Sequence, residues 1–539
     1  MKQKKIKTGI AIVLLIACVG GFAAWQYWKI REKDKYHFNP QSSVKTSTDA
    51  EHGYSVSTPS ELATEVGMSV LEAGGNAADA AVAVGYTLAV VEPYASGLGG
   101  SGGLLIYDSN SGDCTFYDYR ATAGSASNTS DNIGVPGFVA GLDSLHKDYG
   151  SLSLSDVLDP AIYYAENGFT INENLGYRLN YNKDELSKYS WFYDENKNYL
   201  ETGGLLRQPQ LAKVIQAIAS DGSDAFYKGW IAEDIVEATS LTMEDLADYQ
   251  VYKREAIQGT FQGYTVYSAN SPLSGVTLVQ MLEMADMLDI ANPESDPKTY
   301  LSQVKQITAA AYGDRYSTIG DPSFYKIDTQ NLVSETYVKN LLNQDYEDEG
   351  YDKDTESIET TSYSIVDSNG LVVTATNTLT RLWGSRIAVD GVFLNNSNTN
   401  FSPSGINAYE SGKRSRTYTA PTIITGDNGY LLGIGTPGGN IIPSRLFNVL
   451  VDILKFGEDP QEAVSKMGLL YKNGVLTLEV DENNKTWFNT TNVTDQIVWK
   501  PTGMWWGTIA LAGYSDSDGA FSAYDSRRGA TFAGVYNPK

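Results

Sequence analysis

Glu359-Thr360-Thr361-Ser362-Tyr363-Ser364-Ile365-Val366-Asp367 is the stretch of sequence that decides the fold. An acid-rich loop, residues 346–354, precedes it, and a segment of β character begins directly after Thr360. A chain break before Thr360 would leave one residue with both a hydroxyl nucleophile and a base, its own free α-amine. The stretch therefore predicts a self-cleaving hydrolase or transferase.

A hairpin is expected around this stretch. Residues 362–366 and 371–376 are extended in character, and the Asn369-Gly370 pair between them is a strong hairpin signal. A two-residue turn there places Thr378 opposite Thr361, and a loop one residue longer places it opposite Thr360. In either register the Thr378 hydroxyl can reach the nucleophile or its amine. Because threonine is common in strands, the hairpin alone also fits a purely structural role.

The charge of the chain limits its partners. The formal net charge is -25, and residues 1–36 hold eight Lys or Arg against two Asp or Glu, so the rest of the chain is strongly acidic. An acidic body repels a nucleic-acid backbone, and we expect no nucleic-acid partner. If the substrate is an anion, local arginines must bind it.

Cysteine and histidine are scarce. The two cysteines, Cys18 and Cys114, predict no disulfide framework. The three histidines lie at positions 37, 52 and 146, away from any nucleophile motif, which disfavours a zinc site and a Ser-His-Asp triad. We therefore expect chemistry without a metal or an organic cofactor, as an N-terminal threonine provides.

The N-terminus has the pattern of an export signal. Four lysines among residues 2–7 precede an apolar run over residues 9–28, close to the length that spans a bilayer. We expect residues 1–36 to form a cytoplasmic tail, a membrane anchor and the start of a tether, with the body at the cell surface. The alternatives are a cleaved signal peptide, hence secretion, or a lipoprotein modified at Cys18.

The remainder predicts one compact α/β unit over residues 53–539. Residues 80–91 form a small-residue helix, and a glycine cluster at residues 97–103 leads into a strand at 104–107. Residues 114–119 alternate as a strand that ends in Arg120. Residues 150–350 are expected to be mainly helical, and the chain from Thr360 onward to be strand-rich, with helices at 442–456 and 460–467.

A series of short motifs follows in order from about residue 53 to the C-terminus: Leu71–Ala83, Gly102-Gly103, Gly134-Val-Pro-Gly137, Ala311–Arg315, Gly320-Asp-Pro322, Thr360–Ser364, Leu394-Asn-Asn396 and Thr436-Pro-Gly-Gly439. Together they resemble the γ-glutamyltranspeptidases. The resemblance implies an N-terminal-nucleophile hydrolase fold, a four-layer αββα sandwich. It also implies a cut between Glu359 and Thr360, giving a large chain, 37–359 after the anchor, and a small chain, 360–539.

The same resemblance implies roles for single residues. Thr360 would take the γ-glutamyl group as an ester, and Thr378 would hold its amine and hydroxyl. Gly438 and Gly439 would form an oxyanion hole with backbone N–H groups, and Arg120 would bind the α-carboxylate of the donor. Water or an amine would then accept the γ-glutamyl group.

The departures from the family pattern concern the substrate. Ser362 stands where the family usually has a histidine, and Asn400 where glutathione-cleaving members carry an acid that binds the free α-ammonium. Arg416 is an extra arginine, and Thr417 and Tyr418 replace a Ser-Ser pair. Only eleven residues separate Phe401 from Lys413, too few for the family's lid loop. Two further residues complete the expected substrate-binding set: Thr380 and Ser397.

A neutral Asn400, an additional Arg416 and an open cleft all resemble the poly-γ-glutamate capsule depolymerase branch. Inside such a polymer each α-amine is acylated while each α-carboxylate remains free, which favours arginine over an acid. Two alternatives stay open. One is a glutathione hydrolase or γ-glutamyltransferase acting on small peptides, and the other is an unprocessed, inactive binding protein.

Overall fold

The predicted hairpin forms the centre of a seven-stranded sheet, as strands β9 (Thr361–Val366) and β10 (Leu371–Thr378). This computed structural model describes residue 38 and residues 52–126, 131–344, 359–472, 474–480, 496–501 and 505–538. The strand order is β20-β1-β9-β10-β2-β3-β6, and neighbouring strands are antiparallel. The other strands of this first sheet are β1 (Tyr54–Thr58), β2 (Ser101–Asp108), β3 (Asp113–Tyr119), β6 (Tyr252–Glu255) and β20 (Phe532–Tyr536).

The hairpin follows the longer of the two expected loops. Asn377 pairs with Thr361, so the next position, Thr378, lies opposite Thr360. The loop is Ser368-Asn369-Gly370, and Gly370 ends it in the left-handed region at φ 82°, as in three-residue hairpins. The Asp367 carboxylate accepts hydrogen bonds from two backbone N–H groups of the turn, at 2.8 and 3.0 Å. These bonds stabilise the extra residue and thereby set Thr378 across from Thr360.

A second sheet of six strands packs face to face on the first. Its order is β19-β18-β14-β13-β8-β7. A Cβ atom at Gly435 would lie 3.2 Å from the Ser362 Cβ, and one at Gly433 would lie 3.4 Å from the Ser364 Cβ, so glycines allow close approach. The strands of this second sheet are β7 (Ile257–Phe261), β8 (Tyr264–Ser268), β13 (Thr422–Thr425), β14 (Leu431–Gly435), β18 (Ala510–Ser515) and β19 (Gly519–Ala523).

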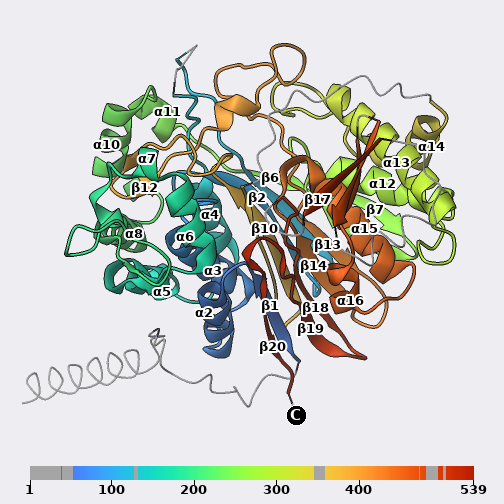
Figure 1. The fold of residues 1–539 in the computed structure, drawn as a ribbon, viewed down its shortest axis with the longest axis horizontal. Helices are drawn as coiled ribbons and strands as arrows, with labels where there is room; N and C mark the ends of the chain where they lie inside the picture. Colours follow the sequence, from blue (N-terminus) through green and yellow to red (C-terminus); the bar gives the residue numbers. More distant parts are fainter. Residues whose placement is uncertain are drawn as a thin grey trace, which may run out of the picture. The chain divides into compact units, whose positions relative to one another are not determined.

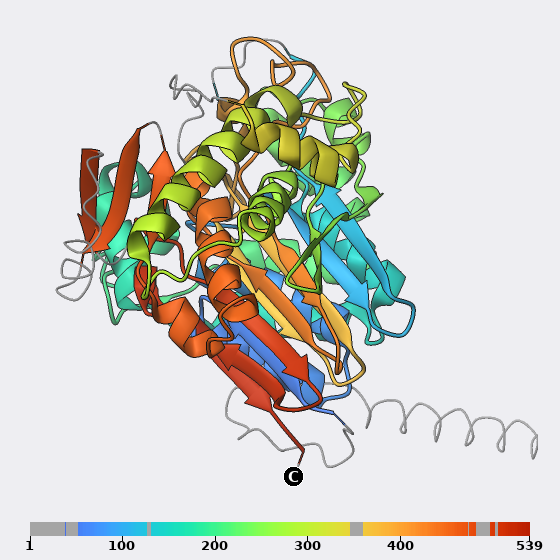
Figure 2. The same cartoon turned by 90° about the vertical axis from the view of Figure 1, so that its right-hand side faces the viewer.

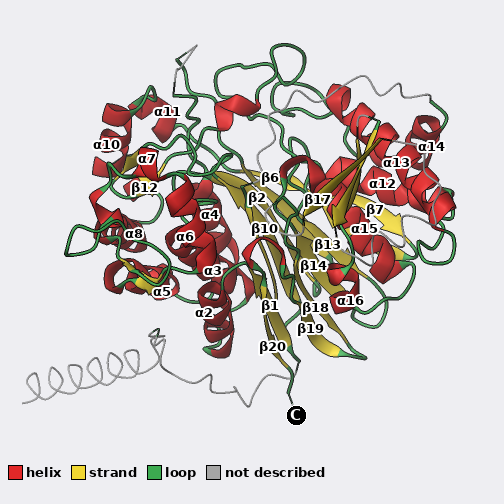
Figure 3. Cartoon of the chain, in the orientation of Figure 1, coloured by secondary structure: helices red, strands yellow, loops and turns green. Residues whose placement is uncertain are grey.

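Helices cover the outer face of each sheet (Figures 1 and 3). On the first sheet lie α2 (Glu61–Glu72), α3 (Ala77–Val91) and α4 (Phe138–Tyr149). On the second lie α12 (Gly275–Met287) and α16 (Pro460–Ser465), and α13 (Pro297–Thr318) and α15 (Ile442–Leu454) pack with them. Figure 2 views this second helix layer from its outer side. The layers therefore run helix, sheet, sheet, helix, as the family resemblance implied.

Over the described residues 150–344 the expected mainly helical segment is present, apart from the short strands β4 (Phe169–Thr170) and β5 (Leu205–Leu206) and the part between Tyr252 and Ser268. This part forms β6, β7 and β8, and the turn between β7 and β8 is Gln262-Gly263, with φ of 53° and 85°. Positive φ at both positions matches the twist of a tight hairpin, but glutamine is a weak sequence signal for that turn. Besides α12 and α13, the α-helices here are α5 (Leu154–Asn167), α6 (Glu173–Tyr181), α7 (Lys183–Leu186), α8 (Pro209–Asp221), α9 (Asp224–Tyr227), α10 (Trp230–Ala238), α11 (Met243–Ala247) and α14 (Glu335–Leu342).

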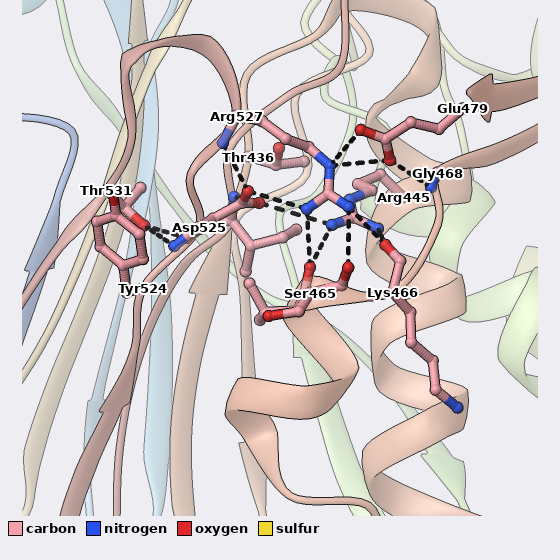
Figure 4. A network of polar contacts seen from close by, with 12 residues as sticks. Thr436, Arg445, Ser465, Lys466, Gly468, Glu479, Tyr524, Asp525, Arg527 and Thr531 are labelled. Carbon is pink, nitrogen blue, oxygen red and sulfur yellow. Dashed lines mark hydrogen bonds and ion pairs between the residues drawn. The ribbon is translucent and has the colours of Figure 1, made fainter. Parts of the chain in front are cut away.

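A buried charge network ties the last part of the chain to the second helix layer (Figure 4). Arg527 Nε lies 2.9 Å from both carboxylate oxygens of Glu479, and its Nη1 lies 2.9 Å from Asp525 Oδ1. Arg445 on α15 lies 3.5 Å from the other oxygen of Asp525. Glu479 belongs to a small sheet of β15 (Leu469–Lys472), β16 (Val475–Val480) and β17 (Gln496–Pro501). The network thus fastens α15, this small sheet and the C-terminal strands together.

Strands from both sides of position 360 alternate in the first sheet. The strands β1, β2, β3 and β6 precede Thr360 in the chain, whereas β9, β10 and β20 follow it. The described residues from 52 onward form one compact unit. The expected tail and anchor in residues 1–36 lie outside the described residues, and no helix within the described part is long and apolar enough to cross a membrane.

Candidate active site

Thr360 and Thr378 face each other at the open end of the hairpin. Thr360 Oγ1 lies 3.5 Å from Thr378 Oγ1, and the Thr378 hydroxyl donates to the Glu359 carbonyl oxygen at 2.9 Å. The backbone N–H of Thr380 donates to Thr378 Oγ1 at 2.7 Å. A hydroxyl has one proton to donate and two lone pairs to accept with. Thr378 can therefore receive the Thr360 proton while it donates its own to the Glu359 carbonyl.

Thr360 and Arg120 belong to one row across the first sheet. Thr378 pairs with Ser101, and the register of β2 with β3 brings Ser101 opposite Arg120. Neighbouring strands are about 4.8 Å apart, so the backbones of Thr360 and Arg120 are about 14 Å apart. Arg120 Nη1 lies 3.4 Å from Ser101 Oγ, so the guanidinium turns back along the row toward the two threonines.

The Arg120 side chain is fully buried with neutral groups as hydrogen-bond partners. Besides Ser101, its Nη2 donates to Ser415 Oγ at 3.2 Å, and within the described residues its Nε has no hydrogen-bond partner. Burial lowers the pKa of Arg120 to about 10, although the charge of Asp118 opposes this shift. Asp118 itself is ion-paired with Arg414, at 3.3 Å. Since buried charges in proteins are normally paired, Arg120 has the character of an anion-binding residue.

Hydroxyl groups connect the Arg120 end of the row to the threonine end. Ser415 donates to the Ser397 carbonyl at 3.4 Å, and the hydroxyls of Ser397 and Thr380 lie 2.9 Å apart. Thr380 has a φ of 80°, a conformation that costs a residue other than glycine about 1–3 kcal/mol. Its hydrogen bonds to Thr378 and Ser397 hold it there. The structure therefore places these two expected substrate-binding residues beside Thr378.

The Gly438-Gly439 turn is directed toward the same end of the sheets. Strand β14 passes Ser364 at Gly433 and Ser362 at Gly435, so its continuation approaches Thr360. Gly438 has a φ of 138° and Gly439 a φ of 60°, both outside the range that other residues favour. A 3₁₀ turn over Gly439–Ile441 leads into helix α15 at Ile442, and the backbone N–H groups at the start of a helix attract negative charge.

Asn400 and Arg416 are joined by Asn407. The Asn407 amide donates to the Asn400 carbonyl at 2.8 Å and accepts from the Arg416 backbone N–H at 2.8 Å. The Arg416 guanidinium donates to the Tyr316 carbonyl at 2.7 Å and stacks over the Tyr316 ring at 4.6 Å. The short segment between Phe401 and Lys413 thus forms a compact turn that brings these two expected substrate-binding residues together.

Thr417 and Tyr418 lie apart from this row. The Thr417 backbone N–H donates to the Pro272 carbonyl at 3.0 Å. The Tyr418 ring stacks on Tyr312 and lies 3.5 Å from the Arg315 guanidinium, within the apolar core between the second sheet and its helices. Among the described residues, no hydrogen bond joins either residue to Thr360 or Thr378, so the geometry gives their expected substrate contacts no support.

Ser362 fits the narrow space between the sheets. Its hydroxyl lies 3.1 Å from that of Thr376 on the neighbouring strand, and Gly435 of the second sheet is directly opposite. A larger side chain here would require the sheets to move apart. The small residue that departs from the family pattern is therefore matched by a glycine across the interface.

Three site residues had no sequence signal that we recognised. Ser101 and Ser415 hold Arg120, and Arg178 on helix α6 reaches Glu359, with Arg178 Nη2 3.5 Å from Glu359 Oε2. All three depend on contacts between distant segments. In the described residues no group of His, Cys, Asp and Glu side chains is placed to hold a metal ion.

Comparisons with known proteins identify the family. The family model described as gamma-glutamyltranspeptidase matches residues 63–495. The chain is 39% identical over 445 residues to the capsule biosynthesis protein CapD proenzyme of Bacillus anthracis, covering 82% of each chain. It is 34% identical over 466 residues to the glutathione hydrolase proenzyme of Escherichia coli, covering 76% of this chain and 79% of that one.

The fold has a solved counterpart. The structure of cephalosporin acylase from Bacillus halodurans superposes with a TM-score of 0.78 at 22% identity, covering 93% of this chain and 99% of that chain. At this identity the likeness concerns the fold alone. Together with the family model and the relatives, it shows that the chain has the N-terminal-nucleophile hydrolase fold and belongs to the gamma-glutamyltranspeptidase family of enzymes.

Proposed function

We propose that the protein cleaves itself before Thr360 and then acts as a γ-glutamyl hydrolase or transpeptidase on poly-γ-glutamate or another γ-glutamyl polymer. The observation that carries this proposal is the row from Thr360 through Thr378 and Ser101 to Arg120. It combines a nucleophile, a proton acceptor and a buried cation on one line.

The hydrogen bonds around Thr378 support self-cleavage. Thr360 Oγ1 attacks the Glu359 carbonyl carbon while its proton passes to Thr378, which donates its own proton to the carbonyl oxygen. The C–N bond then breaks, the proton moves to the departing amine, and an ester joins Glu359 to Thr360. Water hydrolyses this ester, so that Glu359 gains an α-carboxylate and Thr360 a free amine and hydroxyl.

Turnover uses the same nucleophile with its new amine as the base. An α-amine has a pKa of about 8, so it can accept the hydroxyl proton near neutral pH. The γ-carbonyl of the donor lies at Thr360, its α-carboxylate binds Arg120, and the N–H groups of Gly438 and Gly439 stabilise the oxyanion. The leaving amine takes the proton, and water or another amine then removes the γ-glutamyl group.

Three observations support a polymeric donor. Asn400, which Asn407 joins to Arg416, carries no charge that would bind a free ammonium. Arg120 contacts Ser415 and thus lies beside the Arg416 position, within an otherwise acidic chain, and two arginines favour repeated carboxylates. The relative at 39% identity is named a capsule biosynthesis protein.

Self-cleavage is tested by gel electrophoresis and N-terminal sequencing. The purified protein should give two bands in place of one at 58.7 kDa, and the smaller should begin at Thr360. Thr360→Ala should give only the uncut chain and no activity. A small chain that still begins at residue 360 in this variant would exclude Thr360 as the nucleophile of the cut.

The donor is tested by mass spectrometry. Incubation with γ-linked polyglutamate should yield shortened chains, or adducts when an amine is added. The second candidate is a glutathione hydrolase, which relatives at 33–34% identity favour. Rapid glutathione turnover without any change in the polymer would establish that candidate and overturn the polymer assignment.

We also propose that the enzyme is held at the cell surface by its N-terminus. The lysines at residues 2–7 and the apolar run over residues 9–28 support this placement. Extraction of membranes with carbonate should leave the large chain, residues 1–359, in the pellet, whereas the large chain of a variant that begins at residue 43 should be recovered in the supernatant.

A further inference from the structure

Glu359, the residue before the nucleophile, is held by a buried arginine. Arg178 Nη2 lies 3.5 Å from Glu359 Oε2, and both side chains are largely excluded from solvent, at 0% and 11% exposure. Arg178 comes from helix α6, where its Nη1 also donates to the Asn174 carbonyl at 3.2 Å. Its guanidinium stacks over the Tyr94 ring at 4.2 Å. We call Arg178, with Asn174 and Tyr94 that hold it, the clamp on Glu359. All three residues are far from Glu359 in sequence.

The electrostatics of the clamp favour a carboxylate. Burial alone would lower the pKa of Arg178, but the neighbouring Tyr94, Glu359 and Glu92 raise it above its usual value. The guanidinium thus stays charged in a buried place, which water reaches poorly. A buried cation next to the Glu359–Thr360 bond fixes the direction of the Glu359 side chain.

The chemical structure of Glu359 matches that of the proposed donor. In a γ-glutamyl group the reacting carbonyl carbon is followed by three carbons and then a carboxylate. In the α-acyl group of Glu359 the reacting carbonyl carbon is likewise followed by three carbons, Cα, Cβ and Cγ, and then a carboxylate. The two acyl groups differ in the position of the nitrogen, which lies beside the carboxylate in one and beside the carbonyl in the other.

We propose that Glu359 serves as the chain's own glutamyl substrate during self-cleavage and that Arg178 is the positioning residue that binds its carboxylate. This inference rests on the proposed function. With the carboxylate fixed by Arg178 and the carbonyl oxygen fixed by Thr378, the five-carbon unit of Glu359 is held at both ends. Its carbonyl carbon then faces the Thr360 hydroxyl, and the bonds form and break as described for self-cleavage.

Arg178 and Arg120 each bind a glutamyl carboxylate, Arg178 during self-cleavage and Arg120 during turnover of donors. Arg120 lies on the Thr378 side of the nucleophile, on the row through β10 and β2, whereas Arg178 approaches from helix α6. The carboxylate of the first acyl group, Glu359, binds Arg178. The carboxylates of later donors bind Arg120.

The test follows self-cleavage of the full chain in cell-free translation, by the half-time for loss of the uncut band. We expect Arg178→Gln and Glu359→Gln each to slow cleavage by about 10- to 100-fold, the range for losing a charged hydrogen bond. The double variant should be no slower than the slower single variant, because both remove the same interaction. Arg178→Lys should restore part of the rate, and Glu359→Asp, one carbon shorter, should not.

Controls separate this role from a structural one. The exposed pair of Arg386 and Glu185 lies 3.1 Å apart, so Arg386→Gln is a matched loss of an ion pair and should leave the rate unchanged. In a Thr360→Ala background, which cannot cleave, Arg178→Gln should lower the melting temperature more than Arg386→Gln does, because it removes a buried partner of Glu359. Arg178→Lys should show the role through rate instead, by cleaving faster than Arg178→Gln. A rate in Arg178→Lys no higher than in Arg178→Gln, or additive effects in the double variant, would overturn the positioning role.

The outcome is distinguishable from failure of the proposed function. If the wild-type chain is never cut, or Thr360→Ala is cut at the same place, the proposed function fails. If the wild-type chain is cut, Thr360→Ala is not, and both glutamine variants cleave at the wild-type rate, this inference alone is overturned.

Discussion

The Thr378 hydroxyl takes part in three contacts at once, with Thr360, the Glu359 carbonyl and the Thr380 backbone N–H. Thr378→Val keeps the shape but removes these contacts. Losing one donor to a developing oxyanion costs about 100- to 1,000-fold in rate, and we expect self-cleavage to slow by that factor. Thr378→Ser, which keeps the hydroxyl, should stay within about tenfold of the wild type. Equal rates in the valine and serine variants would contradict the proton path.

Arg120 is predicted to set how donor binding depends on pH. Burial lowers its pKa to about 10, so it stays charged at any pH well below that value. In Arg120→Lys the same burial acts on an ammonium group, whose ordinary pKa of about 10.4 is already lower than that of arginine. A cation binds carboxylate only below its pKa, so donor KM should rise with pH in this variant where the wild-type KM stays flat. The measurement is KM for a γ-glutamyl anilide across alkaline pH.

Arg120→Met supplies the control for that experiment. Without a charge, its KM should be high and independent of pH across the same range. A parallel rise of KM in the wild type and in Arg120→Lys would instead assign the pH dependence to another group, such as the Thr360 amine.

At the level of elements, the Gly438-Gly439 turn should be sensitive to a single methyl group. Gly438 has a φ of 138°, and a Cβ there would lie 2.5 Å from Ile441 Cγ1. Gly438→Ala should therefore displace the turn and lower kcat by about 100-fold, as for a lost oxyanion donor. Gly457 also has a positive φ, but a Cβ there meets open space. Gly457→Ala should cost about 1 kcal/mol of stability and leave kcat unchanged.

The hairpin shows how far an element can be predicted from sequence. The β-branched runs and Asn369-Gly370 were sufficient to place β9 and β10, and they left two registers open. The choice between them depends on Asp367, whose carboxylate holds the turn and also accepts a hydrogen bond from Ala77 N–H at 2.9 Å. Since Ala77 begins a helix 290 residues earlier, no local pattern contains this information.

Contacts between distant segments also separate the predictable site residues from the others. Thr360, Thr378 and Arg120 lie in or beside motifs that resemble the family, and the structure brings them onto one row. Ser101, Ser415 and Arg178 are ordinary residues in ordinary elements, and they meet the site only because the sheets and helices pack as they do. Tyr418, expected at the substrate, lies instead in a core that depends on Tyr312 and Arg315.

For the whole molecule, the buried network in Figure 4 should dominate the stability of the C-terminal part. Arg527 is 6% exposed and pairs with both Glu479 and Asp525. Arg527→Met would leave two buried carboxylates without this partner, and we expect a loss of about 3–5 kcal/mol in the free energy of unfolding. The exposed pair of Lys228 and Asp224 gives the control, because Lys228→Ala should cost no more than about 1 kcal/mol.

Denaturant unfolding of each variant measures both effects. Comparable losses for Arg527→Met and Lys228→Ala would mean that the buried network contributes no more than a surface contact. The Thr360→Ala background is suitable for this comparison, because a single uncut chain unfolds without separation of fragments.

The alternation of strands around position 360 bears on what happens after a cut. The fragment that begins at Thr360 would contribute β9, β10 and β20 to a sheet whose β1, β2, β3 and β6 belong to the other fragment. Neither piece could leave without breaking continuous backbone ladders on both flanks of the hairpin. Dilution should therefore never dissociate the two polypeptides, and once denatured apart they would have to find each other as a bimolecular reaction. Folding as a single precursor chain would therefore place the strands of both fragments in one sheet before the cut, which two separate fragments could not readily achieve.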